Sequence, residues 1–93
     1  MRIDKYLQLS RILKQRSTAK EVCEAGHVWR LSGPEGLSPL KAASEVHEGD
    51  RIRIRAYNKI WTVEILEIPA TKNVSKQKAS SLYQIISEEV VEG

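Results

Sequence analysis

The sequence predicts an α+β fold, with two N-terminal helices on a small antiparallel sheet and a C-terminal helix. Apolar residues recur at helical spacing before Gly26 and again after Ser75. Between Asp50 and Ile65 they alternate with a period of two, which is typical of strands. The 93 residues are the length of one domain. We therefore expect the helices to pack against the sheet around a single core.

The N-terminal part of the chain is expected to form two short helices in succession. The first lies within residues 2–14, with a break near Ser10, where the apolar pattern rotates. The second begins at Ser17 or Thr18. Thr18 followed by Glu21 fits a capping box, in which each side chain bonds a free backbone N–H of the first turn.

Short strands separated by turn residues are expected after the second helix. Gly26 can end that helix, because glycine tolerates the positive φ of the C′ position. Ser32–Pro39 contains two glycines and two prolines and is expected to be a long turn or loop. Pro69 ends the last strand, since proline cannot donate to a strand ladder. The expected strands are Val28–Leu31, the alternating run from Asp50 to Arg55 and the run from Trp61 to Ile65.

Residues 69–93 are expected to form a linker, an amphipathic helix and an acidic tail, following a domain over residues 1–68. Ser75 is an acceptable N-cap for this helix. Its apolar stripe at i, i+3, i+4 and i+7 consists of Ala79, Leu82, Tyr83 and Ile86. The glutamates that follow predict a solvated end.

The charge of the chain is positive and unevenly distributed. The net charge is +3, and the isoelectric point is about 9.2. Residues 1–60 carry twelve cations against seven carboxylates, whereas residues 61–93 carry three cations against five. A polyanionic partner is therefore expected, on a binding surface within the first two thirds of the chain.

The sequence offers little for catalysis or metal binding. Cys23 is the only cysteine, so no internal disulfide can form, and its place on the second helix predicts a small buried residue. Cys23, His27 and His47 match no zinc-binding spacing, and the sequence has no visible nucleophile–base pair. No apolar run approaches the roughly 18 residues of a membrane span. We expect a cytoplasmic, non-enzymatic protein without cofactor, metal or membrane partner.

Six cations lie on or between the two N-terminal helices. Because the apolar positions take one helix face, the cations are directed to the other. Arg16 comes just before the expected start of the second helix, where free N–H groups and the positive dipole end attract anions. This predicts an anion site around Arg11, Arg16 and Ser17, with Arg2 beside it. The ordered segments are Arg2-Ile3-Asp4-Lys5-Tyr6-Leu7, Ser10-Arg11, Arg16-Ser17-Thr18-Ala19-Lys20 and Ala25-Gly26-His27-Val28.

This ordered set resembles the S-four-type RNA-binding domain, also called the αL motif. The resemblance extends from Arg2 to Ile54 and implies two helices packed on a small sheet that binds structured ribosomal or transfer RNA. The segment Leu31–Pro39 is longer than the corresponding first hairpin of the family. The RNA-facing region of the family corresponds here to Arg2, Asp4, Lys5, Arg11, Arg16, Ser17, Lys20 and Lys41.

Three further segments are similar to a stand-alone bacterial subfamily that acts in ribosome-associated quality control. This resemblance implies binding to large-subunit rRNA and peptidyl-tRNA on obstructed large ribosomal subunits. It also implies support of the partner RqcH, which adds C-terminal alanine tails to stalled chains. We expect the chain to be a monomer. The segments are Lys41-Ala42-Ala43-Ser44-Glu45-Val46, Lys59-Ile60-Trp61-Thr62-Val63 and Ala79-Ser80-Ser81-Leu82-Tyr83.

Two groups of charged residues have alternative interpretations. Asp4 cannot attract phosphate, so we expect it to stabilise a helix N-terminus or to orient Lys5 or a neighbouring arginine. Arg51, Arg53 and Arg55 share one strand face, which is either a secondary RNA contact or an exposed face paired with Glu64 across a hairpin. Trp61 alternates with Val63 and Ile65 and is expected to pack in the core.

Three other functions compete with this interpretation. One is a heat-shock-type factor that rescues released large subunits, although the acidic C-terminal residues of this chain differ from the basic extension typical of that relative. Another is an accessory RNA-binding module for an RNA-modifying enzyme. The last is a DNA-binding helix–turn–helix protein, which the clustering of cations at the start of the second helix disfavours.

Overall fold

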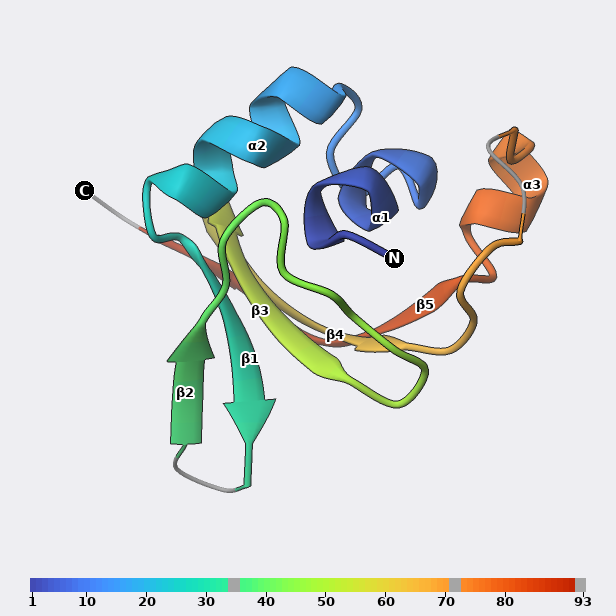
Figure 1. Cartoon of the computed structure of the whole chain (residues 1–93). Helices are drawn as coiled ribbons and strands as arrows, with labels where there is room; N and C mark the ends of the chain where they lie inside the picture. Colours follow the sequence, from blue (N-terminus) through green and yellow to red (C-terminus); the bar gives the residue numbers. More distant parts are fainter. Residues whose placement is uncertain (34–35, 71–72, 92–93) are drawn as a thin grey trace.

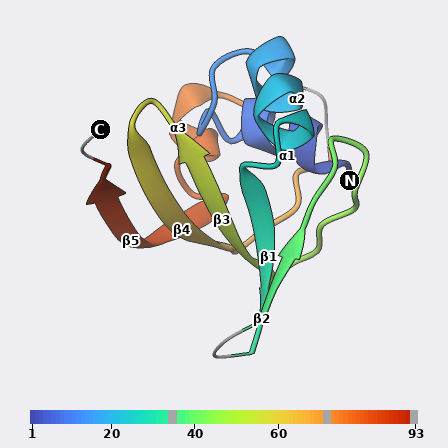
Figure 2. The same cartoon turned by 90° about the vertical axis from the view of Figure 1, so that its left-hand side faces the viewer.

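The computed structural model describes residues 1–33, 36–70 and 73–91. Within them, three helices lie on one side of a five-stranded antiparallel sheet with strand order β2-β1-β3-β4-β5 (Figure 1). The predicted α+β class is confirmed. Figure 2 shows the β1–β2 hairpin extending away from the helices. The elements are α1 (Ile3–Leu9), α2 (Arg16–Glu24), β1 (Val28–Ser32), β2 (Gly36–Pro39), β3 (Arg51–Ala56), β4 (Lys59–Ile65), α3 (Lys76–Ala79) and β5 (Tyr83–Val90).

The two N-terminal helices are present, but the predicted capping box is wrong. Helix α1 ends with Ser10 as its C-cap, which confirms the break near that residue. Helix α2 begins at Arg16, so Thr18 lies inside its first turn and cannot be the N-cap. Gln15 is the N-cap instead, and its carbonyl accepts the first helical hydrogen bond, from the Ala19 N–H at 3.1 Å. Gly26 follows the helix with φ +80°, as predicted.

The central strands follow the predicted alternation. Ile52 and Ile54 of β3 are buried on the inner face of the sheet, between more exposed arginines. Strands β3 and β4 are joined by Tyr57 and Asn58, which both have positive φ. This is the backbone of a type I′ hairpin turn, which matches the twist of the two strands.

Strand β2 was not predicted from the residue pattern, although the family resemblance implied a lengthened hairpin over Leu31–Pro39. It lies within Ser32–Pro39, which was expected to be a turn or loop, but the structure pairs it with β1 in antiparallel register. A β-carbon at Gly36 would collide with the carbonyl of its cross-strand partner Ser32. Pro39 is tolerated because β2 is an edge strand with an unpaired side. Glycine and proline are therefore compatible with this strand, although they predict a loop.

The C-terminal region forms a strand where a long helix was expected. The Ser75 Oγ accepts a hydrogen bond from the Lys78 N–H at 3.1 Å, so Ser75 is the N-cap, as predicted. The helix ends at Ala79, where the Ser80 and Ser81 hydroxyls donate to carbonyl oxygens of the same turn. The next residues form β5, which pairs with the free edge of β4.

Two predictions for the C-terminal region are therefore wrong. The apolar stripe does not continue as a helix through Ile86. Glu88 and Glu89 are exposed, as expected, but they belong to a paired strand and not to a tail. The β-branched residues Ile85 and Val90 fit an extended backbone, and the edge of β4 supplies the hydrogen bonds. Glu92 lies outside the described residues.

The core lies between the helices and the inner face of the sheet. The Tyr6 hydroxyl donates to the Leu82 carbonyl at 2.7 Å and so connects α1 to the start of β5. Burial raises the pKa of Tyr6, and it raises the pKa of the Cys23 thiol to about 12. Cys23 is buried, as predicted. None of the helices described here is long and apolar enough to cross a bilayer. Other buried core residues are Ile3, Leu7, Leu13, Ala19, Val28, Val46, Ile52, Ile54, Val63 and Ile65.

Candidate nucleic-acid interface

A buried carboxylate joins two of the predicted arginines. Asp4 is 1% exposed, and its two oxygens accept hydrogen bonds from Nε and Nη2 of Arg2, both at 3.1 Å. The Nε of Arg16 lies 3.6 Å from Asp4 Oδ2. The backbone N–H of Lys5 also donates to Asp4 at 2.7 Å. Asp4 thus stabilises the start of α1 and orients arginines, as expected; we call Arg2, Asp4 and Arg16 the Asp4 cluster.

The Asp4 cluster retains a positive charge that faces solvent. One carboxylate faces two guanidinium groups, whose side chains are 47% and 51% exposed for Arg2 and Arg16. A guanidinium held at one edge still has N–H groups on its other edges, and their planar geometry matches phosphate oxygens. The cluster therefore holds two guanidinium groups in position to donate hydrogen bonds to an anion.

The first turn of α2 contributes further donors next to Arg16. The N-cap Gln15 makes no side-chain capping bond. Within the described part of the chain, the N–H groups of Arg16, Ser17 and Thr18 have no hydrogen-bond acceptor. Ser17 itself is exposed in this turn. These N–H groups and the positive end of the helix dipole favour an anion.

Lys5, Lys20 and Lys41 lie around the helix layer and belong to no ion pair among the residues described. Lys5 is half-buried on α1, and Lys20 is exposed on α2. Lys41 is exposed on the connection between β2 and β3. That connection is fixed to both helices, because Ala42 donates to the Glu24 carboxylate at 3.2 Å and Ile3 donates to the Ser44 carbonyl at 2.8 Å.

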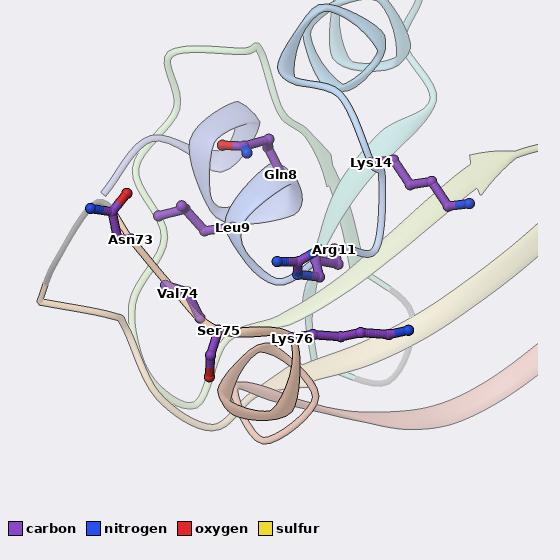
Figure 3. Close-up of a pocket in the computed structure, with 8 residues that line it drawn as sticks. All are labelled: Gln8, Leu9, Arg11, Lys14, Asn73, Val74, Ser75 and Lys76. Atoms are coloured by element: carbon purple, nitrogen blue, oxygen red, sulfur yellow. The ribbon is translucent and has the colours of Figure 1, made fainter.

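Arg11 lies apart from the Asp4 cluster. It follows α1 with φ +62°, and its side chain lines a cleft of about 1020 Å³ together with Lys14 and Lys76. Figure 3 shows Arg11 between α1 and α3. The structure thus brings Arg16 together with Arg2 at Asp4, and it brings Arg11 together with Lys14 and Lys76 at the cleft.

The arginines of β3 occupy the outer face of the sheet, opposite the helices. Arg51 pairs with Glu64 of β4, with 3.2 Å between Nε and Oε1, so the predicted cross-hairpin pairing is confirmed for this residue. Arg53 is half-buried beside Trp29 of β1, and Arg55 is exposed. Neither Arg53 nor Arg55 has an ion-pair partner in the described ranges.

Trp61 and Trp29 lie on opposite faces of the sheet. Trp61 packs against the core, as expected, and its ring makes an edge contact with Tyr57 at 6.4 Å between centroids. Glu88 of β5 pairs with Lys59, with 3.1 Å between Nζ and Oε1; Lys59 and, to a smaller extent, Trp61 lower the pKa of this carboxyl. Trp29 lies opposite Arg53 on the outer face.

Three polar residues of interest are not among the predicted site residues. Lys14 and Lys76 join Arg11 at the cleft, but they are far apart in sequence, and Lys76 belongs to the acidic third of the chain. Arg30 contacts the Glu45 carbonyl and pairs with Asp50 at 3.5 Å, while its buried Nε has no partner within the described residues. No sequence pattern marks the cleft, because only the tertiary fold places its two sides together.

Comparison with known proteins gives close relatives over almost the whole chain. No protein-family model matches it. The RQC P-site tRNA stabilizing factor of Halalkalibacterium halodurans is 43% identical over 91 residues, covering 98% of this chain and 96% of that protein. The factor of the same name from Bacillus subtilis is 37% identical, covering 96% and 95%, and that from Helicobacter pylori strain 26695 is 43% identical, covering 89% and 92%.

Two solved structures share the fold. The trimeric structure of Vibrio cholerae Heat Shock Protein 15 matches with a TM-score of 0.76 and 26% identity, covering 94% of this chain and 82% of that one. The solution structure of the hypothetical protein HP1423 matches with a TM-score of 0.73 and 37% identity, covering 96% and 100%.

Proposed function

The chain belongs to the family of RQC P-site tRNA stabilizing factors, and on this premise we propose that it binds ribosomal RNA and P-site tRNA on the large ribosomal subunit. The subunits concerned are obstructed by a peptidyl-tRNA during ribosome-associated quality control. In this role it supports the addition of alanine tails by RqcH. It acts in the cytoplasm, as a monomer and without catalysis of its own, by stabilising the position of RNA.

The Asp4 cluster is the observation that supports this proposal. A buried carboxylate fixes two arginines in place while leaving one net positive charge at the surface. Because the arginines are already positioned, binding a phosphate costs little side-chain entropy. The free N–H groups of the first α2 turn lie beside Arg16 and supply further hydrogen bonds.

The other predicted RNA-facing residues form the surroundings of this cluster. Lys5, Lys20 and Lys41 add positive potential that attracts RNA, and Ser17 is in position to donate from its hydroxyl. On the outer face, Arg53 and Arg55 form the secondary contact. Arg51 contributes less there, because Glu64 already neutralises it.

One alternative function has structural support. The similarity to Heat Shock Protein 15 favours a heat-shock-type factor for large-subunit rescue. The two functions differ in their dependence on RqcH. If removal of this protein leaves RqcH-dependent alanine tailing unchanged in cells, the rescue function is favoured over the proposed one.

The proposal is tested by measuring binding to large ribosomal subunits that carry peptidyl-tRNA. We expect Arg16→Ala and Arg2→Ala each to weaken binding about tenfold, because each removes a charge-assisted hydrogen bond to phosphate. Each should also flatten the salt dependence by about one unit. Arg51→Ala is the matched control: it removes the same charge from a side chain that is 60% exposed but is paired with Glu64.

Circular dichroism and thermal unfolding show whether each variant keeps the fold. If folded Arg16→Ala and Arg2→Ala bind like Arg51→Ala, the Asp4 cluster is not the RNA site. If the unmodified protein does not sediment with these subunits, the proposed function is wrong.

A further inference from the structure

A basic cleft lies between the end of α1 and the C-terminal helix α3. It has a volume of about 1020 Å³. One side carries Arg11 and Lys14 from the connection between α1 and α2, and the other carries Lys76 from α3. Figure 3 shows Lys14 and Lys76 extending to the same side, with Arg11 between them. The remaining lining residues are Gln8, Leu9, Asn73, Val74 and Ser75, so no carboxylate of the described residues lines the cleft.

The three cations of this cleft are not neutralised. Among the ion pairs of residues 1–33, 36–70 and 73–91, none includes Arg11, Lys14 or Lys76. Lys78 provides a contrast within the same short helix, because its Nζ lies 2.7 Å from the Glu67 carboxylate. Like charges that line one cleft without a counter-ion repel one another, and a bound anion removes this repulsion.

The backbone at Arg11 supports the same interpretation. Its φ of +62° lies in the left-handed region, which glycine adopts without steric cost and arginine does not. The conformation is maintained by hydrogen bonds from the Arg11 N–H to the Gln8 carbonyl and from the buried Leu13 N–H to the Leu7 carbonyl, both at 3.1 Å. An arginine at a position that suits glycine better indicates that its side chain has a use.

We propose that this cleft binds the phosphodiester backbone of RNA as a second contact, separate from the Asp4 cluster. The proposal rests on the RNA-binding function proposed above. Helix α1 has seven residues, so its two ends are about 10 Å apart, with the Asp4 cluster at its start and the cleft at its end. Two phosphate contacts at this separation fix the orientation of the protein on RNA, whereas one does not. The C-terminal region thus takes part in binding through Lys76.

The experiment measures binding of the full chain to large ribosomal subunits carrying peptidyl-tRNA, over a range of salt concentrations. We expect Lys76→Ala and Lys14→Ala each to weaken binding several-fold and to flatten the salt slope by about one unit. The matched control is Lys78→Ala, which removes a lysine from the same helix where Glu67 already neutralises it. It should change affinity by less than twofold.

Arg11→Gly separates structure from binding. Because glycine accepts positive φ, this variant should melt at the same temperature as the unmodified protein or above it, while binding several-fold more weakly. Unchanged binding by folded Arg11→Gly contradicts the proposal.

The outcomes distinguish the two proposals. If Arg16→Ala weakens binding while Lys76→Ala and Lys14→Ala behave like Lys78→Ala, the cleft is not an RNA contact and the proposed function stands. If the unmodified protein does not bind, both proposals are wrong. If Lys76→Ala and Lys14→Ala weaken binding while Lys78→Ala does not, the cleft is a second contact.

Discussion

The helix side and the outer sheet face both present arginines, but the two faces differ in how the arginine charge is paired with carboxylates. On the helix side, Arg2 and Arg16 share one carboxylate, which is buried. On the outer face, Arg51 forms a one-to-one ion pair with Glu64, and both side chains are partly solvated. Exposed pairs of the second kind contribute about 0.2–1 kcal/mol and leave no net charge.

If the Asp4 cluster binds RNA as proposed, the number of cations on a surface is a poor guide to where an anion binds. Two features matter more: the charge left after local pairing, and whether the side chains are already held in position. The Asp4 cluster has both features. Arg51 has neither, although it belongs to the most regular basic stripe in the sequence.

Among the substitutions that test this comparison, replacing Asp4 should have the largest effect on stability and on RNA binding. We expect Asp4→Asn to lower the free energy of unfolding by about 2 kcal/mol, because it weakens the charged hydrogen bonds of a buried group. Binding to large subunits should also weaken, although the net charge rises from +3 to +4. Denaturant unfolding and subunit binding test this prediction. Tighter binding by Asp4→Asn would show that total charge matters more than arginine positioning.

Alkaline pH should destabilise the helix side through its buried groups. The pKa of the Cys23 thiol is about 12 in the folded protein against 9.0 for the free group, so this contribution is intact below pH 9. It is lost as pH rises from 9 towards 12, because only the unfolded chain then releases the proton, at up to about 1.4 kcal/mol per pH unit. The buried Tyr6, whose pKa is also raised, adds to this loss.

Denaturant midpoints measured at pH 8 and pH 10.5 test this effect. Cys23→Ala should reduce the difference between the two midpoints. An equal pH dependence in the variant and the unmodified protein would show that the thiol does not contribute.

Tyr6→Phe should separate the stability of the helix side from its charge. We expect a loss of about 1 kcal/mol from the hydrogen bond to Leu82, with unchanged RNA binding. The loss is limited because the Leu82 carbonyl still accepts from the backbone N–H groups of Leu66 and Glu67. Tyr57→Phe is the control, since Tyr57 is 63% exposed, and its unfolding midpoint should not move. Weaker RNA binding by folded Tyr6→Phe would argue against this separation.

Breaking the ion pair on the outer face should have the smallest effect on stability. A double-mutant cycle of Arg51→Ala and Glu64→Ala is expected to give a coupling energy of about 0.2–1 kcal/mol that decreases with salt. The cycle is measured by denaturant unfolding at low and high salt. A coupling well above 1 kcal/mol would show that this pair stabilises the sheet more than an exposed ion pair does.

Local sequence rules predicted the parts of the fold that depend on neighbouring residues. The break near Ser10, the positive φ of Gly26 and the buried face of β3 follow from backbone chemistry and alternation. The paired strand β5 does not, because Ala79, Leu82 and Tyr83 fit a helix equally well. Only the open edge of β4, which is a tertiary feature, decides between the two.

The candidate site shows the same division. The nearness of Asp4 to Arg2 in sequence, together with the start of a helix, was enough to expect that the carboxylate orients an arginine. The presence of Lys76 and Arg11 at one cleft could not be predicted, because they are far apart in sequence and only the tertiary fold places them together. Folding places a cation of the acidic third beside cations of the basic third.

The hydrogen bond between Tyr6 and Leu82 connects the first helix to a residue that is synthesised much later than the helix itself. It joins residues 76 positions apart, and Leu82 also accepts the backbone bonds that turn the chain out of β4. Contacts of such long sequence separation form slowly, since the intervening chain must first be brought together. During synthesis, α1 cannot form this bond before Leu82 has left the ribosome. The N-terminal arginines are thus made first, but the bond that connects their supporting helix to the residue before β5 requires most of the chain.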